Sequence, residues 1–223
     1  MKKLPYQDFW YNGVYEKGKT NTVGTFYSFN IDWLKKSVLD LGCNEGSMCL
    51  SAKQAGAKEV VGVERNDAYF KSAKKRASWT LGSNRIHYVK GEIVDYVLEN
   101  DKRYDVVLML AIIRHIHKYF MNIIWQHGRY LIYDSYQEII KNRSKTVKPF
   151  NDFMSRCIGL ANQYFITSFD DHSGLIQRNK EDVIKYFKGL TNGDCDIEVY
   201  TIMYPYTVVL IRRKKWNTNP HLA

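Results

Sequence analysis

Cysteine is scarce in this sequence, and its four copies are scattered. Cys43, Cys49, Cys157 and Cys195 form no Cys-x-x-Cys pair. Such spacing supports neither a disulfide framework nor a zinc site. We therefore expect reduced thiols and no metal.

Long apolar runs are also absent. No stretch of the 223 residues approaches the length that spans a bilayer. The first eight residues, MKKLPYQD, lack the apolar core of a signal peptide. We expect a cytoplasmic protein without membrane contact, built as a single domain over residues 1–223, and its oligomeric state stays open.

Acidic residues are fewer than basic ones: 23 Asp and Glu stand against 33 Lys and Arg, a formal net charge of +10. An anionic partner such as RNA would explain this excess. So would the lysine-rich codon usage of an AT-rich genome. Net charge relates to partners only statistically, so both explanations stay open.

The Gly-x-Gly-x-x-Gly pattern of a dinucleotide site is missing as well. The nearest stretch is SVLDLGCNEG at 37–46, where an apolar strand passes through a glycine turn into a predicted helix at 47–55. Asp40 and Glu45 would place carboxylates beside a pyrophosphate, which like charge disfavours. S-adenosylmethionine carries an ammonium and a sulfonium instead, and carboxylates suit both.

The stretch 37–46 resembles the first motif of class I S-adenosylmethionine-dependent methyltransferases. The likeness continues through GAKEVVGVE at 56–64 and YDVVLML at 104–110. It implies S-adenosylmethionine as the cofactor and an α/β, Rossmann-like sheet that is mostly parallel, with one antiparallel C-terminal strand and helices on both faces. Within the class, the chain partly resembles RNA 5′-phosphate methyltransferases and enzymes acting on small molecules or wobble uridines.

Glu64 ends the second predicted strand, 24 positions after Asp40 (64 − 40). A carboxylate there can accept hydrogen bonds from both ribose hydroxyls. By resemblance, Glu92 contacts the adenine amino group and Ile93 packs on the ring. The cofactor residues that the resemblance implies are Asp40, Gly42, Cys43, Asn44, Gly46, Glu64, Arg65, Glu92, Ile93 and Leu110.

The segment after the fourth predicted strand, at 104–111, carries the candidate catalytic residues. It lacks the Asn/Asp-Pro-Pro-aromatic motif of enzymes that methylate base amino groups, and has Arg114, His115 and His117 instead. A histidine can act as the base for a hydroxyl acceptor, and an arginine can hold an anionic one. We favour His115, because its position matches a histidine common in the family.

These residues predict methyl transfer to an oxygen of a small-molecule acceptor by in-line displacement. The first alternative is an RNA methyltransferase acting on a 5′-phosphate or a modified base. A dinucleotide-dependent oxidoreductase and a catalytically silent cofactor-binding subunit are the remaining alternatives.

The aromatic-rich residues 1–36 predict short helices and loops that form a cover or lid over the cofactor. A fifth strand is predicted at 129–134, followed by an insertion at 135–181 near the acceptor site. That insertion contains a basic loop at 141–148 and a helix at 151–165. Two antiparallel strands, at 196–203 and 207–212, are predicted to end the sheet.

Overall fold

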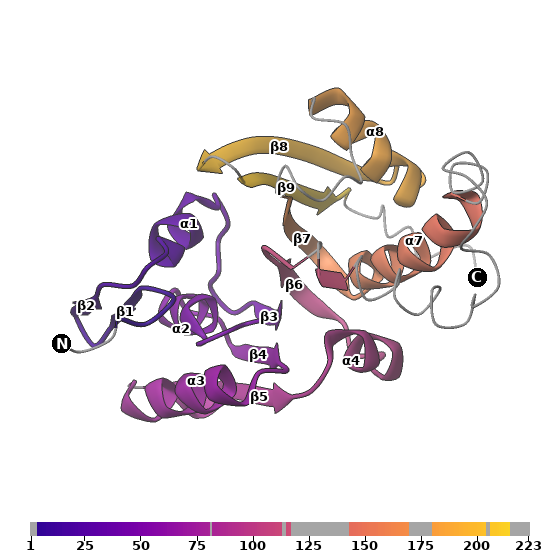
Figure 1. Ribbon diagram of the computed structural model, residues 1–223. Helices are drawn as coiled ribbons and strands as arrows, with labels where there is room; N and C mark the ends of the chain where they lie inside the picture. Colours follow the sequence, from indigo (N-terminus) through magenta and orange to yellow (C-terminus); the bar gives the residue numbers. More distant parts are fainter. Residues whose placement is uncertain are drawn as a thin grey trace, which may run out of the picture.

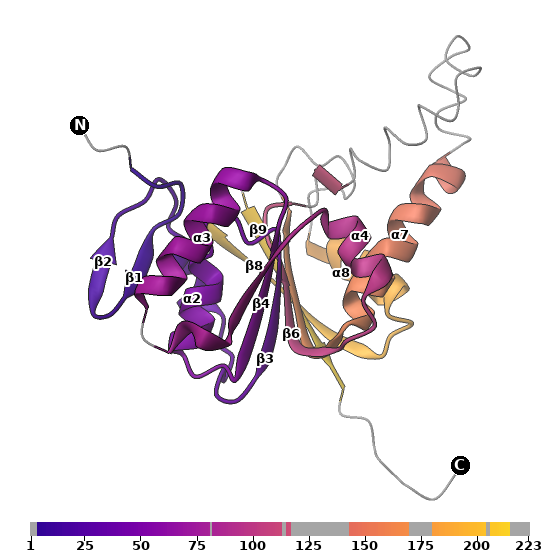
Figure 2. The same cartoon turned by 90° about the horizontal axis from the view of Figure 1, so that it is seen from below.

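A seven-stranded sheet with helices on both faces forms the body of the protein, and the N-terminal hairpin lies at one side of it (Figures 1 and 2). The computed structural model describes residues 4–80, 82–112, 115–116, 143–169, 180–203 and 206–214. The sheet strands are β3 (Ser37–Leu41), β4 (Glu59–Glu64), β5 (Ile86–Lys90), β6 (Tyr104–Met109), β7 (Ala161–Phe169), β8 (Cys195–Met203) and β9 (Tyr206–Arg213). The helices are α1 (Thr22–Ser28), α2 (Ser47–Gln54), α3 (Asp67–Trp79), α4 (Ile93–Glu99), α7 (Arg143–Gly159) and α8 (Lys180–Leu190), with a short 3-10 turn at Ser83–Arg85.

The strand order is β5-β4-β3-β6-β7-β9-β8. All neighbours from β5 to β7 are parallel, whereas β9 runs antiparallel to both β7 and β8. The predicted sheet, mostly parallel with one antiparallel C-terminal strand, is therefore confirmed.

Each face of the sheet has its own core because neighbouring residues on a strand point to opposite sides. Val38 and Val106 belong to the cluster on the face that α1, α2 and α3 cover. Leu39 and Val107 belong to the other cluster, on the face of α4, α7 and α8 (Figure 2). Strands buried on both faces read as continuous apolar runs, as these do.

The predicted fifth strand, at 129–134, lies outside the described residues. In the structure β7 pairs in parallel with β6. The predicted helix at 151–165 is wrong beyond Gly159, where α7 ends. Apolar residues keep a helical spacing up to Leu160, so the sequence pattern gives no sign that the helix ends at Gly159 and a strand follows.

The first turns of α7 replace part of the predicted basic loop, since the helix already begins at Arg143. Pro149, a residue that disfavours a helical interior, lies within α7. Both α7 and β7 fall within 135–181, the range that the sequence assigns to an insertion. Because β7 pairs with β6 and β9, this part of the range belongs to the sheet itself.

The N-terminal region contains a small hairpin, which contradicts the prediction of helices and loops alone. Its strands are β1 (Phe9–Tyr11) and β2 (Val14–Glu16), which pair antiparallel. Asn12 and Gly13 both have positive φ, 50° and 77°, as a two-residue hairpin turn of type I′ requires. The Asn-Gly pair is a strong hairpin signal, and the many aromatics around it obscured the alternation of the strands.

Within the described residues, no helix combines the length and the apolar character that crossing a bilayer requires.

Candidate active site

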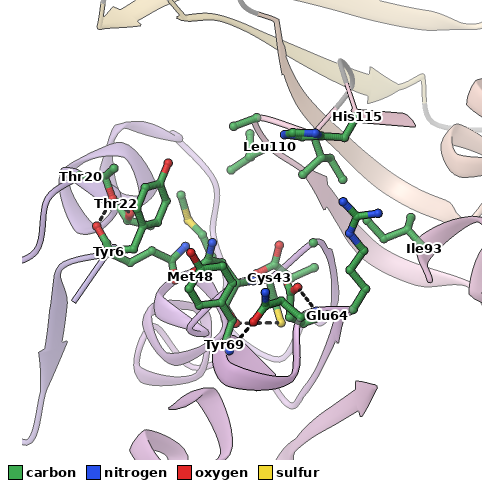
Figure 3. Close-up of a pocket in the computed structure, with 18 of the residues that line it drawn as sticks. Tyr6, Thr20, Thr22, Cys43, Met48, Glu64, Tyr69, Ile93, Leu110 and His115 are labelled. Atoms are coloured by element: carbon green, nitrogen blue, oxygen red, sulfur yellow. Dashed lines mark hydrogen bonds between the residues drawn. The ribbon is translucent and has the colours of Figure 1, made fainter. Parts of the chain in front are cut away.

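A cavity of about 780 Å³ opens at the carboxyl edge of the sheet, where β3, β4 and β6 end and α4 begins (Figure 3). Open α/β sheets bind their ligands at this edge. The glycine turn and Glu64 form its floor, Ile93 lies to one side, and Tyr6, Thr20 and Thr22 of the N-terminal segment lie to the other. Three parts of the chain that are remote in sequence thus enclose one space.

The turn after β3 is shaped by residues with positive φ. Gly42 has φ +79°, and the backbone N–H groups of Gly42 and Cys43 donate to the Val63 carbonyl at 2.9 and 3.0 Å. A Cβ on Gly42 would stand 2.9 Å from Cγ2 of Ile112, inside the cavity lining. The bare glycine therefore keeps the backbone accessible to a ligand.

Glu64 is 7% exposed and lies at the end of β4, as predicted. The backbone N–H of Asn44 donates to its Oε2 at 2.9 Å, and that of Asn66 donates to its Oε1 at 2.6 Å. Each carboxylate oxygen has a second lone pair, so Glu64 can still accept from two ligand hydroxyls. The same carboxylate thus holds two turns together and lines the cavity.

Asp40 is nearly inaccessible, with 3% of its surface exposed. Burial raises the pKa of Asp40 to about 7, the hydrogen bond from the Cys49 thiol (3.4 Å) lowers it in part, and the charge of Glu64 raises it further. The carboxyl group therefore titrates near neutral pH and lies at the bottom of the cavity.

The opposite end of the cavity combines an ion pair with apolar side chains. Arg65 and Glu92 pair at 3.7 Å, and both side chains are well exposed. Ile93, half-buried, opens α4 beside them, and Leu110 lines the cavity where β6 has ended. A flat apolar ring with a polar edge suits such a surface.

The segment after β6 supplies one described catalytic candidate. His115 lines the cavity, and its backbone N–H donates to the Ile112 carbonyl at 2.9 Å. Ala111 adopts φ 56°, a left-handed conformation that L-residues rarely adopt and that tends to occur at functional sites. Arg114 and His117, the other two candidates, lie outside the described residues.

Gly46 is not among the lining residues, although the sequence analysis assigned it to the cofactor. It has φ +86°, and a Cβ there would collide with Tyr88 and contact Ala73. Its role in the structure is the packing of α2 against β5 and α3.

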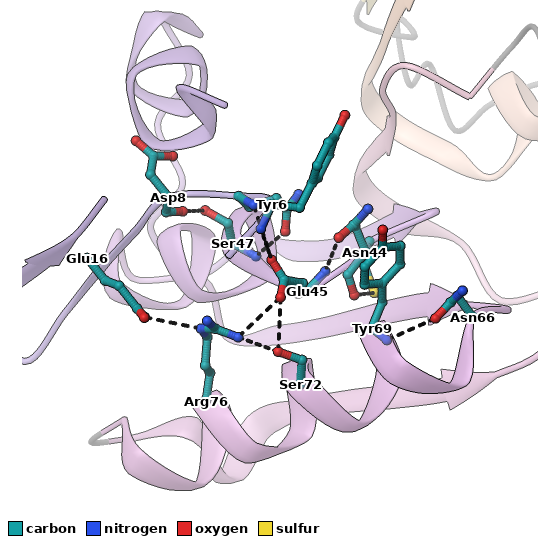
Figure 4. A network of polar contacts seen from close by, with 12 residues as sticks. Tyr6, Asp8, Glu16, Asn44, Glu45, Ser47, Asn66, Tyr69, Ser72 and Arg76 are labelled. Atoms are coloured by element: carbon teal, nitrogen blue, oxygen red, sulfur yellow. Dashed lines mark hydrogen bonds and ion pairs between the residues drawn. The ribbon is translucent and has the colours of Figure 1, made fainter. Parts of the chain in front are cut away.

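Glu45 serves the fold on the outer side of the turn (Figure 4). Its Oε2 accepts the backbone N–H groups of Tyr6 (2.7 Å) and Gln7 (3.1 Å). Its Oε1 accepts from the Ser72 hydroxyl and pairs with Arg76 at 3.6 Å. Glu45 therefore attaches the N-terminal segment to the cofactor turn, and its charge is compensated there.

Sequence reasoning missed most of the wall opposite Ile93. The wall residues from the N-terminal segment are Tyr6, Gln7, Lys19, Thr20, Asn21, Thr22 and Thr25. No motif marks them, because hydrogen bonds to residues about 40 positions away bring them to the cavity, such as the one from the Ser47 N–H to Gln7 Oε1 (3.1 Å). Within the described part of the chain, no group of three or more His, Cys, Asp or Glu side chains could hold a metal ion.

Comparison with known proteins agrees with this geometry. Residues 38–130 match a family described as a methyltransferase domain. Over this stretch and in its fold, the chain is similar to class I methyltransferases. Its strand order with an antiparallel β9 differs from the parallel sheet of the dinucleotide-binding fold.

The solved structures that resemble the methyltransferase domain share its fold. A magnesium protoporphyrin IX methyltransferase from Synechocystis with bound S-adenosylmethionine aligns with a TM-score of 0.56 and 18% identity, over 86% of this chain and 77% of that one. A methyltransferase from Listeria monocytogenes, described as S-adenosylmethionine dependent, aligns with a TM-score of 0.54 over 87% of this chain and 100% of that one.

Sequence relatives cover less of the chain. Protein arginine N-methyltransferase 1 of Dictyostelium discoideum is 40% identical over 67 residues, which is 30% of this chain and 19% of that protein. A ubiquinone biosynthesis O-methyltransferase of Saccharophagus degradans is 33% identical over 82 residues, 37% of this chain and 34% of that protein. The chain thus spans about a fifth to a third of the length of these relatives.

Proposed function

We propose that the protein is an S-adenosylmethionine-dependent methyltransferase that transfers the methyl group to an oxygen of a small-molecule acceptor by in-line displacement. The observation that carries the proposal is the pairing of Glu64 with the open glycine turn at Gly42. Both line one cavity at the carboxyl edge of a sheet with the class I strand order.

The described residues fit such a cofactor in three places. Glu64 keeps two free lone pairs for the ribose hydroxyls, beside Asn44. Asp40 offers a carboxylate to the ammonium of the methionine moiety. Ile93 and Leu110 offer an apolar surface to the adenine ring, and Glu92, paired with Arg65, accepts from its amino group.

Bound S-adenosylmethionine supplies a methyl group made electrophilic by the sulfonium. Around the reacting atoms, His115 acts as the general base that removes the proton from the acceptor hydroxyl. Ile112 and Ile116 limit access of water from the same side, since both line the cavity and Ile116 is only 4% exposed. Arg114 and His117 remain candidates for holding an anionic acceptor.

The small-molecule acceptor has two supports. The relatives include ubiquinone biosynthesis O-methyltransferases, and the N-terminal segment closes one side of the cavity. RNA stays the second candidate on the strength of the +10 charge.

Calorimetric titration with S-adenosylhomocysteine and with NAD tests the cofactor. We expect binding of the first and none of the second; the reverse would identify an oxidoreductase. A transfer assay with methyl-labelled cofactor against a small-molecule extract and against total RNA then tests the acceptor. His115→Ala should lower the rate of methyl transfer by about a hundredfold or more and leave the affinity for S-adenosylhomocysteine unchanged. Label that enters RNA alone would overturn the small-molecule assignment.

A further inference from the structure

Lys19 lies on the N-terminal wall of the cavity, outside every motif that the sequence analysis used. We propose that the Lys19 ammonium binds the carboxylate of the cofactor's methionine moiety. This subsite rests on the proposed function, because it assumes that S-adenosylmethionine occupies the cavity.

Lys19 differs from the other lining cation, Arg65, in having no carboxylate partner among the described residues. Three carboxylates line it, Asp40, Glu64 and Glu92. Arg65 is engaged by Glu92, whereas no carboxylate of the described residues lies within ion-pair distance of Lys19. A ligand carboxylate would be repelled by the floor of the cavity and attracted to the wall.

The threonine hydroxyl groups on the same wall have their protons committed within the protein. Thr20 Oγ1 donates to the Tyr6 carbonyl at 3.0 Å, which makes Thr22 the donor in its 3.0 Å contact with Thr20. Thr25 Oγ1 donates to the Asn21 carbonyl at 2.8 Å. On this wall the charged donor for a ligand anion is Lys19, with the side-chain nitrogen of Gln7 as a neutral neighbour.

The backbone fixes Lys19 relative to the cofactor turn. Its N–H donates to the carbonyls of Pro5 (3.1 Å) and Tyr6 (3.0 Å), and the Asp8 N–H donates back to Thr20 at 3.3 Å. Gly18 permits this approach, because a Cβ there would collide with the backbone of Gln7 and Asp8. Glu45 holds the other side of the same segment through the N–H groups of Tyr6 and Gln7.

Position and charge together give the two charged groups of the cofactor's amino-acid part separate binding residues. Asp40 receives the ammonium at the floor, and Lys19 receives the carboxylate at the wall. The wall then contributes to cofactor binding, beyond covering the cavity.

Two ligands separate this subsite from the rest of the cavity. S-adenosylhomocysteine carries the carboxylate, and 5′-methylthioadenosine shares the adenosine and sulfur but lacks the amino-acid end. Lys19→Gln should weaken S-adenosylhomocysteine binding about tenfold in calorimetric titration, since one charge-assisted hydrogen bond is lost, and leave 5′-methylthioadenosine affinity unchanged. Lys17→Gln is the matched control: Lys17 is exposed, two residues earlier, outside the lining, and its variant should bind both ligands like the wild type.

Equal weakening of both ligands in Lys19→Gln would overturn the proposal, since it would mean that the wall itself had moved. Unchanged S-adenosylhomocysteine affinity in Lys19→Gln would also overturn the proposal. This holds even if the variant loses methyl transfer to the extract, because Lys19 would then serve the acceptor. A wild-type protein that bound neither ligand would instead refute the proposed function, so the two failures are distinguishable.

Discussion

The pKa of Asp40 predicts a pH dependence that distinguishes this site from a solvent-exposed carboxylate. Burial raises that pKa to about 7, from an ordinary value near 4. A raised folded pKa means that the folded protein holds the proton more tightly than the unfolded chain. Without ligand, the contribution of Asp40 to stability is therefore fully present below about pH 4 and is lost as pH rises toward 7. The full effect is on the order of 4 kcal/mol.

Cofactor binding should show the opposite trend, because the ligand ammonium pairs with the ionised form of Asp40. Each pH unit below 7 then costs up to about tenfold in affinity. We expect S-adenosylhomocysteine to bind at least about tenfold more weakly at pH 5.5 than at pH 7.5, with proton release on binding. Calorimetry in two buffers of different ionisation enthalpy measures both quantities.

Variants isolate the contribution of this one group. Asp40→Asn should bind weakly with no such pH dependence, and should be more stable than the wild type above pH 7. Asp67→Asn is the control, because Asp67 is exposed and paired with Lys71 on α3, and it should keep the wild-type pH profile. Equal wild-type affinity at both pH values, or an unchanged pH profile in Asp40→Asn, would refute the reasoning.

Three further predictions concern Glu64 at the end of β4, Gly42 in the cofactor turn, and the positive net charge of the chain. Glu64→Ala should weaken S-adenosylhomocysteine binding by about 1–3 kcal/mol, whereas Glu59→Ala at the other end of β4 should not; an unchanged Glu64→Ala affinity would remove Glu64 from the site. Gly42→Val should abolish binding in a protein that still folds by circular dichroism, and Gly193→Val, with φ +76° but no neighbour within 4 Å of its Cβ, controls for backbone strain. If the acceptor is a small molecule, RNA binding should be weak and unaffected by neutralising Arg143, Lys145 and Lys148; a micromolar affinity with a steep salt slope, about −0.7 per phosphate contacted, would contradict this.

The sequence predicts the first half of the sheet well because each element there carries its own local signal. β4 ends at Glu64 as predicted, and Asn66 caps α3 by accepting the Tyr69 N–H at 3.1 Å. A β-branched run, a glycine turn and a cap are all readable within a few residues. The predicted antiparallel pair at the C-terminal end is confirmed for the same reason.

Elements whose identity depends on tertiary partners are harder to predict. The residues of β7 are strand-forming, but they follow α7 with only Leu160 between the two elements, so the apolar pattern continues across the boundary. The N-terminal wall of the cavity is harder still. Lys19 and Thr22 have no local signature, and their place at the cavity follows from long-range hydrogen bonds such as that from the Thr22 N–H to Asp8 Oδ1 (2.7 Å).

Glu45 has a local signal in the sequence and a long-range role in the structure. By sequence it belongs to the cofactor turn, and its charge argued against a pyrophosphate ligand there. In the structure that charge faces the backbone of Tyr6 and Gln7 and the Arg76 guanidinium, which also pairs with Glu16 at 3.4 Å and lies 4.0 Å from the centre of the Phe9 ring. The argument against a pyrophosphate therefore rests on Asp40 and Glu64, whose carboxylates line the cavity. Glu45 gives the turn a second attachment: the Asn44 N–H donates to Glu64, and the carboxylate of the next residue, Glu45, accepts from the N-terminal wall.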